Sequence, residues 1–151
     1  MADGSPRLKG FDYTTPGSYF ITFRVSNRQP IFRTPAAAII ACDHILRYRE
    51  REWYGLHAYC VMPDHIHMVA RLQSDSRPLS DIVGTLKATI LHRCRMSGHS
   101  FLWQRGYHDH IVREYEKSDA TIRYTLENPI RAGLVVDFRD YPYSGILDPW
   151  Y

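Results

Sequence analysis

Apolar residues along this chain change their spacing from every second position to every third or fourth position, which predicts alternating strands and helices. The first run, 18–25, is rich in aromatic and β-branched residues and favours a strand. Residues 34–51 then carry apolar side chains at helical spacing, and Thr34-Pro35 is typical of a helix N-terminus. A strand at 55–62 and a second one that begins at His65 follow, and a tight turn between them predicts an antiparallel hairpin.

The second half of the chain repeats this alternation. Helices are expected at 80–96 and 118–127, each with a serine as its N-cap. Short strands are expected at 101–103 and 107–112. Asn128-Pro129 is expected to end the last helix, because proline cannot continue the backbone hydrogen bonds.

This order of elements predicts an α+β protein with a ferredoxin-like fold, also called a split βαβ fold. Such a fold is an antiparallel sheet with helices on one face, here followed by a C-terminal helix. We expect residues 1–151 to form a single domain, with 1–16 as a flexible arm and 144–151 as a tail.

Composition narrows the class of protein. Of the 151 residues, 44% are hydrophobic and 23% are charged, which is ordinary for a globular domain. No apolar run approaches the length of a transmembrane helix, and the N-terminus does not have the pattern of a signal peptide. Three widely spaced cysteines fit neither a disulfide framework nor a structural zinc site, so a cytoplasmic location is expected. A net charge of +3 alone is weak evidence for nucleic acid binding.

The strand that begins at His65 carries the first candidate chemistry. Side chains alternate between the faces of a strand, so His65 and His67 share one face while Ile66 and Met68 point to the core. Two imidazoles so placed can bind one metal ion, or they can simply be polar residues on a half-exposed strand. The alternation supports both interpretations equally.

The last predicted helix carries the second candidate site. Tyr124 and Asn128 are four residues apart and therefore lie on one face, about opposite Ile122 and Leu126. A helix in this position can offer a phenol and a carboxamide to a cleft. Spacing alone favours the simpler alternative, in which Tyr124 covers a surface and Asn128 caps the turn at Pro129.

Three motifs together resemble the single-tyrosine HUH transposases of the IS200-like family, most closely the REP-associated tyrosine transposases. They are Met-Pro-Asp-His-Ile-His at 62–67, Trp-Gln-Arg-Gly-Tyr-His-Asp-His at 103–110, and the stretch from Tyr124 to Val135. The resemblance implies a ferredoxin-like fold and activity on single-stranded DNA, often beside a hairpin. It also implies a monomer or a homodimer.

The resemblance further assigns roles to residues of both candidate sites. His65, His67 and Asn128 correspond to ligands of a divalent metal, Mg²⁺ or Mn²⁺, and Tyr124 corresponds to the nucleophile. In such enzymes the tyrosine forms a 5′-phosphotyrosine and releases a 3′-OH, so that strands are nicked and rejoined. A cation bound near the phosphate reduces the charge repulsion that opposes this attack.

Basic and aromatic side chains elsewhere are candidates for contacts with DNA, although each can equally be a surface charge or a core residue. They are Arg24, Arg28, Lys87, Trp103, Arg105, Tyr107, Arg113, Arg123 and Arg131. We expect His108 and His110 to line or support the site. Two other functions remain open: a nucleic-acid-binding module of the same fold without catalysis, and a metal nuclease that uses water.

Overall fold

The computed structural model describes residues 15–113 and 115–150, with the backbone alone described at 115–117. The expected arm at 1–16 therefore lies almost entirely outside the described residues. Within the described residues, no helix is long and apolar enough to cross a membrane.

The centre of the fold is one antiparallel sheet with the strand order β4-β1-β3-β2-β5. Its strands are β1 (Gly17–Arg24), β2 (Gly55–Met62), β3 (His65–Leu72), β4 (His108–Val112) and β5 (Ser144–Ile146). The helices are α1 (Pro35–Glu50), α2 (Leu79–Met96) and α3 (Tyr115–Arg131). Short 3-10 helices lie at Ser26–Arg28, Ile31–Arg33 and Phe138–Asp140. The order β1-α1-β2-β3-α2-β4 with these neighbours confirms the ferredoxin-like prediction.

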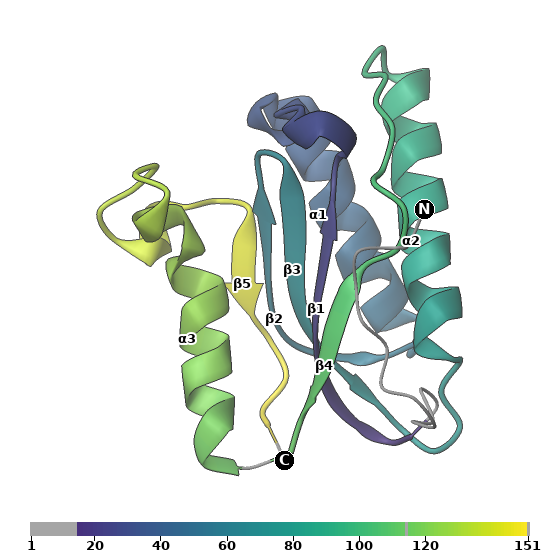
Figure 1. Ribbon diagram of the computed structural model, residues 1–151, viewed down its shortest axis with the longest axis vertical. Helices are drawn as coiled ribbons and strands as arrows, with labels where there is room; N and C mark the ends of the chain where they lie inside the picture. The colour runs from purple at the N-terminus through teal and green to yellow at the C-terminus, as the bar shows by residue number, and fades with distance from the viewer. Residues whose placement is uncertain (1–14, 114, 151) are drawn as a thin grey trace.

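The two faces of the sheet are covered differently. Figure 1 shows α1 and α2 side by side against one face, and α3 standing on the opposite side of the sheet. The main core lies under α1 and α2, where Tyr19, Ile21 and Phe23 of β1 are almost fully buried. Full burial of each such side chain stabilises the fold by about 1.5–3 kcal/mol.

A smaller cluster attaches α3 to the other face. Leu126 of α3 packs between Ala58 of β2 and Val69 of β3, and all three are buried. Partly buried residues complete this group, which we call the α3 cluster: Phe20, Ile122, Phe138 and Trp150. The alternation along β1 and β3 thus supplies the main core with one set of side chains and the α3 face with the other.

The third helix is longer than the sequence pattern predicts at both ends. It begins at Tyr115, so Ser118 lies inside its first turn and is not the N-cap. It also continues through Asn128-Pro129 to Arg131. Pro129 lies in the last turn, where its missing N–H removes a single helical hydrogen bond. Gly133, two residues beyond the end of the helix, has a φ of +75°. The Leu134 N–H donates to the Pro129 carbonyl and the Gly133 N–H donates to the Ile130 carbonyl, which terminates the helix.

Other local expectations differ from the structure in smaller ways. α2 has Pro78 as its N-cap, so Ser80 does not cap it. Thr34 does occupy the N-cap position of α1, but its side chain makes no capping hydrogen bond. Residues 101–103 form no strand, because only Trp103 pairs, in an isolated bridge with Val25.

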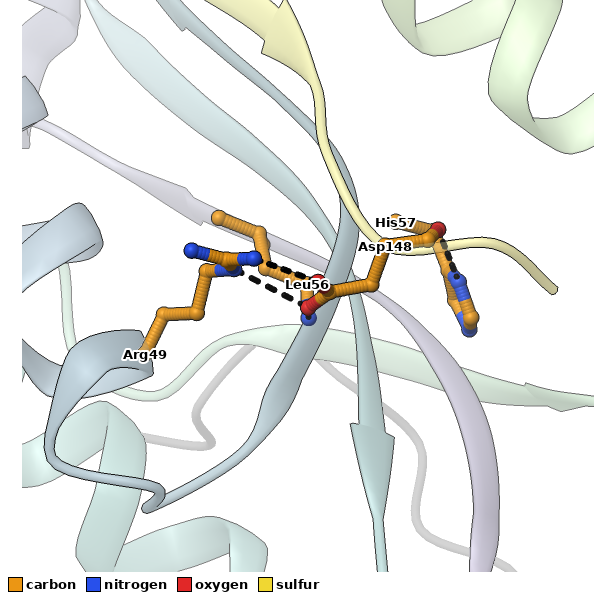
Figure 2. A network of polar contacts seen from close by, with 4 residues as sticks. All are labelled: Arg49, Leu56, His57 and Asp148. Atoms are coloured by element: carbon orange, nitrogen blue, oxygen red, sulfur yellow. Dashed lines mark hydrogen bonds and ion pairs between the residues drawn. The ribbon is translucent and has the colours of Figure 1, made fainter. Parts of the chain in front are cut away.

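The segment expected as a tail, 144–151, is a structured part of the fold up to Trp150. Its first residues form β5, which pairs with β2 at the edge of the sheet. Figure 2 shows how Asp148 then joins three parts of the chain. Its carboxylate accepts two hydrogen bonds from Arg49, at 2.5 and 3.0 Å, and one from the Leu56 N–H at 2.7 Å. Its carbonyl lies 3.0 Å from Nδ1 of His57.

Candidate active site

His65 and His67 lie on β3 with both side chains on the α3 face. Their Nε2 atoms are 3.0 Å apart. Two nitrogen ligands bound to one cation at about 2.1 Å and at a right angle would lie about 3.0 Å apart. The pair therefore fits two neighbouring positions around a single metal ion.

The other nitrogen of each ring is held by a neighbour. Nδ1 of His65 lies 2.6 Å from Oδ1 of Asp64, and because a carboxylate can only accept, this Nδ1 donates. Nδ1 of His67 lies 2.8 Å from Oγ1 of Thr22, which is its cross-strand neighbour on β1. Such contacts fix the orientation of the rings and direct both Nε2 atoms to the same point.

Burial keeps both imidazoles in the neutral form that a metal requires. Burial is the largest of the causes that together lower the pKa of His67 to about 2, and electrostatic repulsion from His65, Arg24 and Arg131 acts in the same direction. Burial also lowers the pKa of His65, although the Asp64 carboxylate opposes this shift. The lone pairs of both Nε2 atoms are therefore available at neutral pH.

Tyr124 brings a phenol from α3 to this pair. Its ring centroid lies 6.2 Å from that of His67 and 6.0 Å from that of Phe20, and 51% of the residue is exposed. Phe20 also stacks on His67 at 5.4 Å, so one phenyl ring supports both groups. Two segments far apart in sequence, β3 and α3, thus meet at one place.

Arg131 covers the other side of Tyr124. Its guanidinium carbon lies 4.0 Å from the centre of the tyrosine ring, and its Nη2 donates a hydrogen bond to the Tyr124 carbonyl. A guanidinium over an aromatic face is attracted by the ring electrons. The contact restrains the tyrosine side chain on its exposed side.

Asn128 lies one helical turn beyond Tyr124 and lines a groove of about 510 Å³ together with His65. Its side-chain nitrogen is buried and has no hydrogen-bond partner among the described residues. The two ends of a carboxamide are assigned by their contacts, so either the oxygen or the nitrogen can face the groove. A buried amide without a partner is costly, which suits a group that binds a ligand.

The donor set matters for the choice of metal. Among the described residues, no group of three or more His, Cys, Asp or Glu side chains could hold a metal ion. Two imidazoles and one amide oxygen would leave further coordination positions for water and phosphate oxygens. This arrangement suits a divalent cation that is bound by the protein and by a substrate phosphate at the same time.

The candidate DNA contacts fall into two groups. Lys87 donates to the carbonyls of Gln104 and Gly106. Trp103 donates to the Lys87 carbonyl, and its partly buried ring packs against the main core. Both side chains, like the buried Tyr107, are engaged within the protein. Their role in DNA binding stays a prediction.

The second group lies at or near the surface. Arg28 and Arg131 line the groove beside His65, and Arg24 pairs with His65 across β1 and β3. Three further arginines are exposed, and their contribution also stays a prediction: Arg105, Arg113 and Arg123.

Three residues of the site were not predicted from the sequence: Phe20, Thr22 and Asp64. The alternation along β1 places Phe20 and Thr22 on one face, but only the pairing with β3 shows which histidine they contact. His108 and His110 are exposed on β4 across β1 from β3, and the ring of His110 lies 5.3 Å from that of Phe20.

Comparisons with known proteins bear on the family to which this chain belongs. The family described as "Transposase IS200 like" matches residues 14–128. A REP-associated tyrosine transposase from Escherichia coli is 24% identical and is aligned over 87% of this chain and 78% of its own length. A Haemophilus influenzae protein, whose name assigns it provisionally to the same group, is 26% identical over 88% of this chain and 81% of its own.

A solved structure shares the fold. It is a REP-associated tyrosine transposase bound to a REP hairpin, and it superposes with a TM-score of 0.76 at 22% identity over 93% of this chain and 81% of that one. The match of the family to most of the chain, from before β1 to Asn128 in α3, covers both halves of the candidate site. The chain therefore belongs to the IS200-like transposase family.

Proposed function

We propose that this protein is a metal-dependent transposase that nicks and rejoins single-stranded DNA through a 5′-phosphotyrosine. The observation that carries the proposal is the approach of Tyr124 to His67, at 6.2 Å between ring centroids, beside two Nε2 atoms only 3.0 Å apart. Family membership supports the same reaction class. The related structure contains a REP hairpin, so a single strand beside a hairpin is the proposed substrate.

His65, His67 and Asn128 would hold the cation, Mg²⁺ or Mn²⁺. The ion would polarise a nonbridging oxygen of the phosphate and make the phosphorus easier to attack. Asp64 and Thr22 hold the two imidazoles in the orientation that this binding requires.

Tyr124 would supply the nucleophile. Its phenol oxygen attacks the phosphorus, the bond to the 3′ oxygen breaks, and the phenol proton is balanced by the proton that the released 3′-OH gains. The product is a 5′-phosphotyrosine that keeps the energy of the phosphodiester bond. A second 3′-OH can attack this linkage, reform a phosphodiester and return the proton to Tyr124.

The test is the loss of the covalent intermediate in the Tyr124→Phe variant. We expect the unsubstituted protein to form a denaturation-resistant adduct with end-labelled single strands from the DNA beside its gene in the presence of Mn²⁺. Tyr124→Phe should form none and still bind the DNA. Tyr143→Phe is the matched control, because Tyr143 packs against the main core and not at the site.

The outcomes separate the alternatives. An adduct in Tyr124→Phe would show that another residue is the nucleophile. Cleavage without an adduct in this variant would favour a nuclease that uses water. Binding without cleavage by the unsubstituted protein would favour a nucleic-acid-binding module.

A further inference from the structure

One groove beside the candidate site is lined by three arginines. Arg28, Arg33 and Arg131 contribute to its wall together with His65 and Asn128. We propose that this arginine groove binds the backbone phosphates of the single strand on one side of the phosphate that is cleaved. The inference rests on the proposed function and adds to it the path of the strand and a new contact, Arg33.

The charge balance of the groove favours an anion. Asp64 supplies the only carboxylate among its lining residues, and that carboxylate already accepts a hydrogen bond from His65 at 2.6 Å. Within the part of the chain that the structure describes, no carboxylate pairs with Arg28 or Arg33. Arg131 donates to the Tyr124 carbonyl through one nitrogen, and a guanidinium has further donors for a phosphate.

The backbone holds Arg28 in an unusual position. Asn27 and Arg28 have φ angles of 57° and 54°, in the left-handed region that side chains other than glycine rarely adopt. Neighbouring hydrogen bonds hold the segment: Ser26 N–H donates to the Leu102 carbonyl at 2.8 Å. Such a conformation persists only where the surrounding structure enforces it, and functional sites are among the places where it clusters.

Arg33 is held beside the proposed metal site by the next 3-10 helix, Ile31–Arg33. The N–H of Phe32, its neighbour, donates to the carbonyl of Pro63 at 2.9 Å, in the turn that leads into His65. Phe32 itself is buried in the main core. This 3-10 helix and the turn before β3 are thus held together, with Arg33 and His65 lining the same groove.

The other residues that line the groove also favour the binding of a single DNA strand. Pro30 and Leu134 add apolar surface beside the arginines. Proteins that hold single strands combine a positive groove for the backbone with surfaces against which sugars and bases pack. Contacts to phosphates do not depend on the base sequence of the DNA. The groove would therefore position the strand without distinguishing one base sequence from another.

The salt dependence of binding tests this path. The probe is fluorescein-labelled oligothymidylate, and its affinity is measured by anisotropy over a series of salt concentrations without added metal. We expect Arg28→Gln, Arg33→Gln and Arg131→Gln each to weaken binding roughly fivefold. Each should also reduce the slope of log affinity against log salt by about 0.7, the value for one phosphate contact with a single strand.

Arg47→Gln on α1 and Arg93→Gln on α2 are matched controls, because both arginines are exposed on helices that cover the other face of the sheet. They should leave affinity and slope unchanged. The proposal is overturned if the groove variants keep the original slope, if the controls reduce it equally, or if the unsubstituted protein does not bind the probe. Polyglutamate that competes as well as unlabelled oligothymidylate would also overturn it, because the groove would then be a general site for polyanions.

The adduct assay on the same preparations separates this inference from the proposed function. Normal adduct formation with unchanged slopes in the groove variants would refute the arginine groove alone. Reduced slopes in a protein that never forms the adduct would support the groove and refute the chemistry.

Discussion

Thr22 offers a direct test of how the proposed metal site is built. Thr22→Val keeps the shape of the side chain and removes the hydroxyl that lies 2.8 Å from Nδ1 of His67. With a cation on Nε2, Nδ1 carries the proton and needs an acceptor. Thr22 and His67 are each only 4% exposed, so water cannot readily replace the hydroxyl.

The size of the effect follows from this burial. A buried donor left without a partner costs about 1–3 kcal/mol. The alternative for His67 is to move the proton to Nε2, which would block the metal position. Loss of such a supporting contact typically lowers metal affinity about 10- to 100-fold, so we expect a weakening in this range for Thr22→Val.

The measurement is the binding of Mn²⁺ by isothermal titration, followed by the Mn²⁺ dependence of adduct formation. Thr22→Ser is the control, because it keeps the hydroxyl and loses only a methyl group. If Thr22→Val binds Mn²⁺ as tightly as the unsubstituted protein, the hydroxyl does not orient His67 and the proposed geometry of the site is wrong.

Two further predictions concern the attachment of α3 and the response to pH. Leu126→Ala should weaken the packing of the α3 cluster by about 2–4 kcal/mol. Hydrogen exchange in α3 should then become faster, while the strands under α1 and α2 stay protected. A uniform loss of protection would show that α3 does not detach separately. His57 is fully buried, and burial lowers its pKa from 6.5. The unfolded chain therefore binds more protons than the native state below about pH 6.5, and stability falls as the pH decreases through this range. Urea unfolding at several pH values should show this loss, and His57→Gln should make it less steep. An equal pH dependence in both proteins would contradict the assignment to His57.

The sequence predicted those features that depend on local spacing. Alternation along β3 placed His65 and His67 on one face, and the interval of four residues placed Tyr124 and Asn128 together on α3. The two histidines and the two α3 residues come together only through contacts between distant segments of the chain. The spacing of residues along the sequence does not predict such contacts. The contact between Thr22 and His67 has the same origin, because it exists only in the register of β1 against β3.

The failures of prediction also have physical causes. Pro129 looks like the end of a helix, but in a last turn it costs one hydrogen bond and the Gly133 motif ends the helix later. The segment after 143 looks like a tail because it is short and contains a proline. Its order comes from Asp148, whose partners Arg49 and Leu56 lie more than ninety residues earlier.

The two faces of β1 respond differently to substitutions and to changes in the length of the strand. Its eight residues contain two interleaved sequences, with Tyr19, Ile21 and Phe23 serving the main core and Phe20, Thr22 and Arg24 serving the site. Point substitutions in the second set change side chains at the candidate site and leave the side chains of the first set in the main core unchanged. Insertion or deletion of one residue in the middle of β1 would exchange the faces of every side chain beyond it. A substitution in β1 therefore changes one face of the strand, whereas a change in its length alters both faces together.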